Sequence, residues 1–187
     1  MNEQQTAALS PQQQAMLEVF GAHMQAELVT QSVDDALATM TDTPHVNHIP
    51  VMTGGVGREG VRAFYTNHLI GQFLPPDTET TTISRTIGTD QIVEESVASF
   101  THTMQMDWML PGIPPTGKRI EIAVVVIIRF QDGKIAHEHI YWDQASVLVQ
   151  LGLIDASSLP VAGAESARKL LDHLLPSNTL IERAKLA

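Results

Sequence analysis

The chain has no cysteine among its 187 residues. That absence excludes disulfide bonds, a thiol nucleophile and any metal site built on thiolates. Basic residues are also few, with 11 Lys and Arg against 21 Asp and Glu, and the formal net charge is −10. Because phosphate backbones and anionic lipid surfaces attract basic proteins, we expect neither a nucleic-acid partner nor a membrane partner.

Long apolar runs are missing as well. The longest, at 122–128, is too short to cross a bilayer, and the first residues lack the basic and apolar regions of a signal peptide. We therefore expect a cytoplasmic location. A chain of this length is most simply one domain over 1–187, with a core at about 11–155 and a helical C-terminal extension at 156–187.

The N-terminal part of the chain has helical periodicity. Ser10 is a favoured N-cap residue, and the apolar residues after it recur at helical spacing, which predicts a helix over 11–29. Ser32 should cap a second, short helix, and 56–73 carries the apolar stripe of a third. Between them, the proline-flanked segment 44–50 is expected to form a loop.

Further along the chain the periodicity changes from helix to strand. Successive segments rich in Thr, Val and Ile predict three or four consecutive strands, and Asp132-Gly133 is typical of a hairpin turn. Helices followed by strands, without βαβ alternation, indicate the α+β class. We expect a curved antiparallel sheet wrapped around the N-terminal helices, with a cavity between the two layers.

The segment "HEHIYWDQ" (137–144) belongs to the last of these strands. Side chains alternate along a strand, so one face carries four polar groups: His137, His139, Tyr141 and Asp143. We interpret this face as the wall of the cavity. The alternative stays open, because Asp143 also fits a helix N-cap, and histidines on a strand are often simply solvated.

The strand over 119–131 is apolar on both faces along most of its length. An antiparallel sheet with one side in water normally alternates apolar and polar residues. We therefore expect the outer face of the sheet to pack against a second subunit, which predicts a homodimer.

At this point the sequence resembles a known family. The stretch "THT…GIPPTGKRIEI…FQDGKIAHEHIYWDQASVLVQLGLI" is similar to the SnoaL-like polyketide cyclases, of the ketosteroid isomerase and nuclear transport factor superfamily. The resemblance covers about 45–155 and implies a cone-shaped barrel with a deep pocket and a dimer through the sheet. By motif, it implies that Asp143 is the family's acid/base aspartate and His102 its strand histidine.

The chain also departs from the family pattern. The segment "MQMDWMLPGI" is longer than is usual in the cyclases, and His139 stands where cyclases often carry Trp. We therefore expect a more polar and differently covered pocket.

Ring closure by aldol addition and keto–enol isomerisation both begin with removal of a proton from a carbon beside a carbonyl. Both reactions need a base that removes the proton and a hydrogen-bond donor that stabilises the developing oxyanion. We predict that Asp143 is the general acid/base and that His102 stabilises the oxyanion, acting on a small apolar or carbonyl-containing molecule such as a polyketide or ketone. The residues expected to contact this substrate are His48, Asn47, Tyr65, Trp108, His139 and Tyr141.

Three other functions are compatible with the same residues. A hydrolase could open a lactone, epoxide or enol ester by activating water, and a non-catalytic protein could simply bind a small ligand. Imidazoles sufficient for a zinc-type site come from His45, His48, His102, His137 and His139. Their spacing matches no standard metal motif, however, so we predict no metal and no cofactor. His23 and His173 are expected on the surface.

Overall fold

The computed structural model describes residues 8–185. Helix α1 (Pro11–Gln25) begins where the sequence predicts, because Ser10 caps it. The Ser10 hydroxyl accepts a hydrogen bond from the Gln13 amide at 3.2 Å, and the Gln13 side chain accepts one from the Ser10 amide at 2.9 Å. This reciprocal capping box satisfies two amides that the helix leaves unpaired.

The helical layer departs from regular α-helix at two places. Helix α1 continues into the π-helical segment η1 (Ala26–Thr30), and α3 (Gly57–Phe64) continues into η2 (Tyr65–Leu69). Between them, the short helix α2 (Val33–Ala38) is capped by Ser32 as predicted.

The six strands form one curved, open sheet in the order β2-β1-β6-β5-β4-β3. The four C-terminal strands confirm the predicted antiparallel meander. The strand bounds are β1 Met40–His48, β2 Thr53–Val56, β3 Glu79–Ile87, β4 Gln91–Thr101, β5 Arg119–Gln131 and β6 Lys134–Trp142.

The predicted loop at 44–50 is wrong, because most of it is strand β1. Strand β1 pairs with β6 in parallel, whereas the other neighbouring strands pair antiparallel, so the sheet is mixed. The register shifts between Met40 and His45, and Pro44 lies within that irregularity. Proline lacks the amide hydrogen that a regular ladder requires, which explains both the bulge and the misleading sequence signal.

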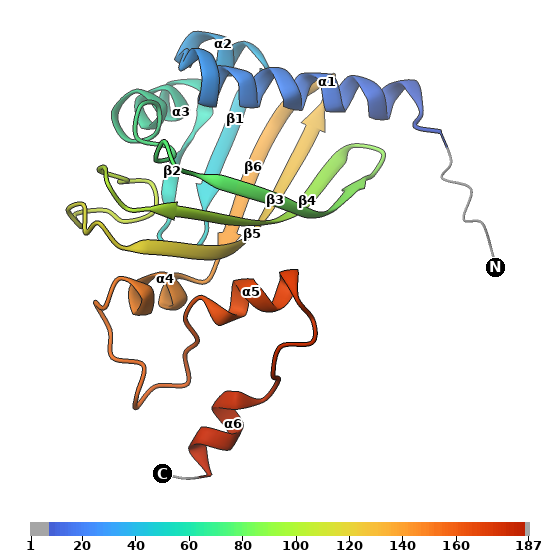
Figure 1. Cartoon of the computed structure of the whole chain (residues 1–187). Helices are drawn as coiled ribbons and strands as arrows, with labels where there is room; N and C mark the ends of the chain where they lie inside the picture. The colour runs from blue at the N-terminus through green and yellow to red at the C-terminus, as the bar shows by residue number, and fades with distance from the viewer. Residues whose placement is uncertain (1–7, 186–187) are drawn as a thin grey trace, which may run out of the picture.

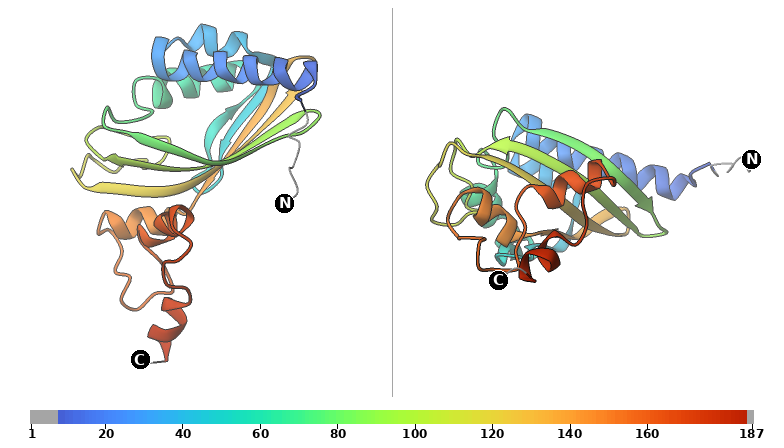
Figure 2. Two further views of the ribbon diagram at one scale, coloured as in Figure 1. Left: turned by 45° about the vertical axis from the view of Figure 1, so that its right-hand side comes forward. Right: turned by 60° about the horizontal axis from the view of Figure 1, so that its bottom comes forward.

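The two faces of the sheet are covered by different parts of the chain. Helices α1 to α3 lie over one face, and α4 (Gln144–Gln150) and α5 (Glu165–Leu171) lie on the other (Figures 1 and 2). The last helix, α6 (Thr179–Ala184), extends away from the sheet (Figure 1). The α+β class is therefore confirmed, with helices wrapped by one face of a curved sheet.

The C-terminal extension packs against the outer face of the sheet, which is the face opposite helices α1 to α3. Ala167 of α5 is fully buried, and Arg168 forms an ion pair with Glu121 of β5. Part of the apolar outer surface that suggested a second subunit is thus covered by the chain itself. Within residues 8–185, no helix combines the length and apolar character needed to cross a bilayer.

Glycine is required where β2 approaches α3. A Cβ atom on Gly55 would lie 2.3 Å from the carbonyl oxygen of Gly60.

We predict that Gly55→Ala lowers the free energy of unfolding by about 2 kcal/mol, because the backbone must shift to relieve the overlap. The exposed Gly21 in α1 meets nothing within 4 Å, so Gly21→Ala should raise that free energy by roughly 0.5–1 kcal/mol. Urea denaturation of both variants checks this, and wild-type stability in Gly55→Ala would contradict it.

Candidate active site

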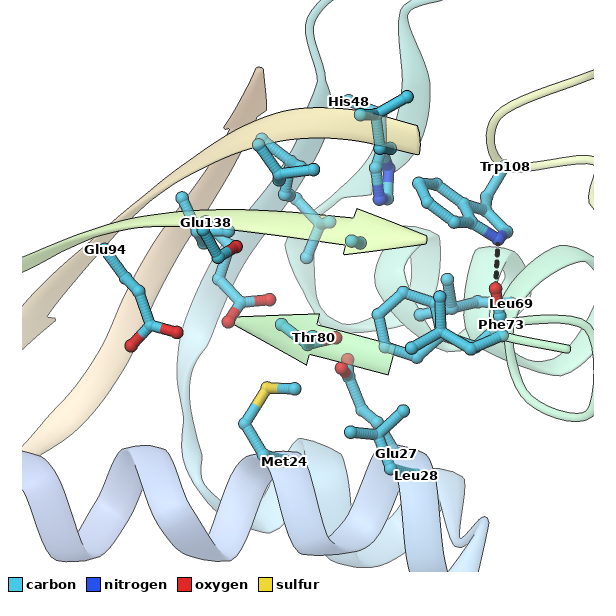
Figure 3. Close-up of a pocket in the computed structure, with 18 of the residues that line it drawn as sticks. Met24, Glu27, Leu28, His48, Leu69, Phe73, Thr80, Glu94, Trp108 and Glu138 are labelled. Carbon is cyan, nitrogen blue, oxygen red and sulfur yellow. Dashed lines mark hydrogen bonds between the residues drawn. The ribbon is translucent and has the colours of Figure 1, made fainter. Parts of the chain in front are cut away.

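A cavity of about 270 Å³ lies between the helical layer and the sheet. Its walls are mostly apolar, and Phe73 and Trp108 contribute aromatic side chains. Figure 3 shows His48 and Trp108 close together, apart from the carboxylate side chains of Glu94 and Glu138. The ionisable and hydroxyl groups that line it are Glu27, His48, Tyr65, Thr80, Glu94, Ser96 and Glu138.

Four of the side chains around this cavity form a buried polar cluster. The Nε2 atom of His23 lies 3.1 Å from Glu27 Oε1 and 3.4 Å from Glu138 Oε2. It also lies 3.2 Å from the Tyr65 hydroxyl, which donates to Glu138 Oε2 at 3.4 Å. We call these residues, His23, Glu27, Tyr65 and Glu138, the carboxylate cluster.

The two π-helical segments each supply one member of this cluster. Glu27 lies in η1 and Tyr65 in η2. A π turn adds a residue to the helical period and so changes the direction in which the following side chains point. The helical periodicity of the sequence does not reveal these changes of direction. The spacing of His23 and Glu27, however, is that of neighbours on one helix face.

Hydrogen bonds fix the protonation of His23. The Thr39 hydroxyl donates to the carbonyl oxygen of Ala36 at 2.6 Å, so it accepts from His23 Nδ1, also at 2.6 Å. Burial by itself lowers the pKa of His23, but the carboxylates of Glu138 and Glu27 together hold it well above 6.5. The ring is therefore an imidazolium at neutral pH, with Nε2–H directed at the two carboxylates. The surface position predicted for His23 is wrong, because this side chain is fully buried.

Tyr65 is kept in its neutral form. Burial is the largest cause that raises its pKa well above 10, and the charges of Glu27 and Glu138 add to the effect. The phenol therefore stays a hydrogen-bond donor.

His48 lies at a different part of the wall and is neutral. Burial lowers its pKa to about 4, although a hydrogen bond to the carbonyl oxygen of Thr53 opposes that shift. Its Nδ1–H donates to Thr53 O at 3.3 Å, which leaves Nε2 as an acceptor. Its ring packs against Trp108, with centroids 5.1 Å apart. This end of the cavity can accept a hydrogen bond from a ligand hydroxyl.

Comparison with known proteins agrees with this architecture. A sequence model described as SnoaL-like polyketide cyclase matches residues 22–151, which is well over half of the chain. The chain belongs to this family. No curated protein matches it.

Solved structures of low sequence identity share the fold of this SnoaL-like protein. One, from Jannaschia sp. CCS1 and described as a candidate SnoaL-like polyketide cyclase, is 18% identical with a TM-score of 0.62, covering 79% of this chain and 99% of that one. IdmH from Streptomyces antibioticus, a proposed polyketide cyclase, is 20% identical with a TM-score of 0.54, covering 73% and 98%. AclR from Streptomyces galilaeus, a proposed hydroxylase, is 17% identical with a TM-score of 0.55, covering 76% and 99%.

The SnoaL-like fold places the predicted substrate-contacting residues on both faces of the sheet. His48, Tyr65 and Trp108 line the cavity. Asn47, His139 and Tyr141 do not line it. The cavity face of β6 carries Glu138 and Ile140, so the prediction that the polar row of 137–143 forms the cavity wall is wrong. Ile140 and Trp142 belong with the apolar core, and alternation then turns the polar row outward.

The two residues predicted as catalytic lie outside the cavity. Asp143 caps α4, with its side chain accepting a hydrogen bond from the Ser146 amide at 3.1 Å. It lines a second hollow of about 300 Å³ on the outer face, beside Tyr141. His102 lies one residue beyond β4 and is fully buried against Thr116, whose amide donates to His102 Nδ1 at 3.3 Å. The structure does not bring Asp143 and His102 together at this cavity.

Two groups within residues 8–185 could each bring three potential metal ligands within 4.8 Å of one another. The first is His23, Glu27 and Glu138 of the carboxylate cluster. The second is His45, His137 and His139, on the outer face of the sheet. Of the five histidines considered as metal ligands from the sequence, His48 and His102 therefore lie elsewhere.

The depressed pKa of His48 makes stability pH-dependent. Between pH 6.5 and about 4, the unfolded chain protonates this histidine and the folded chain does not. The free energy of unfolding should therefore fall as pH falls through this range, by about 3 kcal/mol for this group alone. We predict that His48→Asn removes about 2–3 kcal/mol of the difference between pH 7 and pH 4.5 in urea denaturation. An equal pH dependence in both proteins would show that His48 protonates normally.

Proposed function

We propose that this SnoaL-like protein is an enzyme of the cyclase or isomerase type. It binds a small, largely apolar carbonyl compound in the cavity, and Glu138 acts as the general base that removes a proton from a carbon beside the carbonyl. The observation that carries the proposal is the carboxylate cluster: two carboxylates, an imidazolium and a phenol at the edge of an otherwise apolar cavity.

Glu138 is the better placed of the two carboxylates to act as the base. It projects from β6 beside Ile140, and both residues line the cavity. Behind it, His23 donates toward both carboxylates and Tyr65 donates to Glu138. His23 thus holds the carboxylate in position while a proton is transferred, which favours general-base catalysis.

A donor for the developing enolate oxygen comes from the same cluster. Tyr65 is neutral and lines the cavity, so its hydroxyl can turn from Glu138 to the substrate once that carboxylate takes the proton. His48 is unsuited to this role because its one hydrogen is used on Thr53, but its Nε2 can orient a substrate hydroxyl. Trp108 donates to the carbonyl oxygen of Phe73 and supplies apolar surface only.

This proposal replaces the pair assigned from the sequence. The acid/base chemistry stays the same, but Glu138 takes the role predicted for Asp143, and Tyr65 takes the role predicted for His102. A hydrolase that activates water would use the same carboxylates, and a non-catalytic ligand-binding protein would use the cavity alone. Hydrogen exchange at the acidic carbon of a model substrate separates these functions.

The test is exchange of the acidic hydrogens of a small 1,3-dicarbonyl compound with solvent deuterium, followed by proton NMR. We predict that wild-type protein accelerates the exchange and that Glu138→Gln loses about 10²–10⁴-fold of that acceleration, because the amide keeps the shape but cannot accept the proton. Glu18→Gln, which changes an exposed carboxylate on α1, should exchange at the wild-type rate.

The Asp143→Asn variant decides between the two assignments. If exchange is lost in Asp143→Asn and kept in Glu138→Gln, Glu138 is not the base. If wild type binds the dicarbonyl compound without accelerating exchange, the protein is a binding protein toward this class. Release of acid from a lactone or enol ester, without exchange, would instead favour the hydrolase.

We also propose that two copies associate through the outer face of the sheet. Val93 and Ile127 pair with each other on that face, and both are only partly buried. Helices α4 and α5 cover only part of β4 and β5, so an apolar strip is left for a partner. Multi-angle light scattering measures the oligomeric state. A mass of one chain at all accessible concentrations would contradict the dimer.

A further inference from the structure

Three histidines come together on the outer face of the sheet, away from the cavity. The parallel pairing of β1 with β6 places His45 directly beside His137, and Asn47 beside His139. Because alternate residues of a strand share a face, all three imidazoles project from the same side. His45 joins the other two only because strand β1 pairs with β6. The spacing of His137 and His139 in the sequence does not reveal this third potential ligand.

The three rings are close enough to share one ion. The Nε2 atoms of His45 and His139 are 3.0 Å apart, and one ring nitrogen from each histidine lies within 4.8 Å of the others. The His137 ring stacks on both neighbours, with centroids 4.7 Å from His45 and 4.2 Å from His139. Nitrogen ligands bound tetrahedrally to zinc at 2.0–2.1 Å lie about 3.3 Å apart. The His137 ring would have to rotate out of the stack to bring all three nitrogens onto a common centre.

We propose that His45, His137 and His139 bind one divalent transition-metal ion of the kind that prefers imidazole, such as Zn²⁺, Co²⁺ or Ni²⁺. Three protein nitrogens leave a fourth coordination position open. In the single chain the three residues are only half-buried, so water, an external ligand or a group of the second copy can reach that position. The ion would also cross-link β1 to β6, the one parallel pair of the sheet.

One positive charge lies beside the three histidines. A metal ion binds the unprotonated form of each imidazole, so binding should weaken as the pH falls. Arg129, the positive neighbour opposite His137, forms an ion pair with Asp90 at 2.7 Å, which offsets its charge.

The carboxylate cluster is the competing site for a cation, but it is less suited to a transition metal. Its single imidazole is already protonated on Nδ1 by the hydrogen bond to Thr39 and directs Nε2–H at the carboxylates. A metal ion there would have to displace a proton that two carboxylates stabilise. The outer group consists of three imidazoles and contains no carboxylate.

The experiment uses full-length protein without a histidine tag, freed of metal with a chelator. Titration with ZnCl₂ by calorimetry gives stoichiometry and affinity, and titration with CoCl₂ gives the visible spectrum of the bound ion. We expect one ion per chain, a four-coordinate cobalt spectrum and a higher thermal midpoint with zinc. His139→Phe and His45→Phe keep a ring in the stack and should lower the affinity by at least about 100-fold. His173→Asn, at an exposed histidine, should bind as the wild type does.

Several results would overturn the proposal. They are failure of the wild type to bind zinc stoichiometrically, unchanged affinity in both phenylalanine variants, and loss of binding in Glu138→Gln with retention in His139→Phe. The last result would place the ion in the carboxylate cluster. If the phenylalanine variants do not fold, X-ray absorption spectroscopy of the zinc-loaded wild type identifies the ligands. We expect three nitrogen ligands from imidazoles, and a coordination shell made mainly of carboxylate oxygens would contradict the proposal.

Discussion

The imidazolium of His23, held between the carboxylates of Glu27 and Glu138, is the interaction on which the fold and the cavity both depend. It joins α1 and η1 to β6, and Tyr65 adds η2 to the same contact. Removing one partner from a buried pair of this kind typically costs about 3–5 kcal/mol, because a charge is left unpaired. The carboxylate cluster therefore holds the helical layer to the sheet, in addition to the apolar core between them.

The surroundings of this cluster determine what it can do. Apolar side chains form most of the cavity wall, so a ligand in the cavity meets few other charges. Electrostatic interactions are stronger where water is excluded, and a carboxylate held by His23 needs little rearrangement to accept a proton. Family membership and the cluster together support proton transfer on a small carbonyl compound.

Much of the fold could be predicted from local sequence signals. Ser10 and Ser32 cap helices, the four C-terminal strands follow the alternation of the sequence, and the family motifs identify the SnoaL-like fold. Strand β1 was missed because Pro44 lies in a bulge, and local propensity cannot anticipate pairing with a strand about ninety residues away. The parallel β1–β6 pair was missed for the same reason.

The site was harder to predict than the fold. His48, Tyr65 and Trp108 line the cavity, but the predicted orientation of β6 is wrong. Ile140 and Trp142 pack with the apolar core, so the face of β6 that carries Glu138 turns inward and the polar row turns outward. The burial of His23 could not be predicted, because Tyr65 and Glu138 come from distant segments and Glu27 and Tyr65 lie in π turns. No local pattern encodes such a contact.

The most direct test of the central claim is a pH titration of the His23 ring nitrogens by ¹⁵N NMR. We predict that both nitrogens carry protons at pH 7.5, because the carboxylates of Glu138 and Glu27 outweigh the effect of burial and hold the pKa of His23 well above 6.5. A neutral ring with an unprotonated Nε2 at that pH would contradict the imidazolium, and with it the donor that holds the Glu138 carboxylate in position.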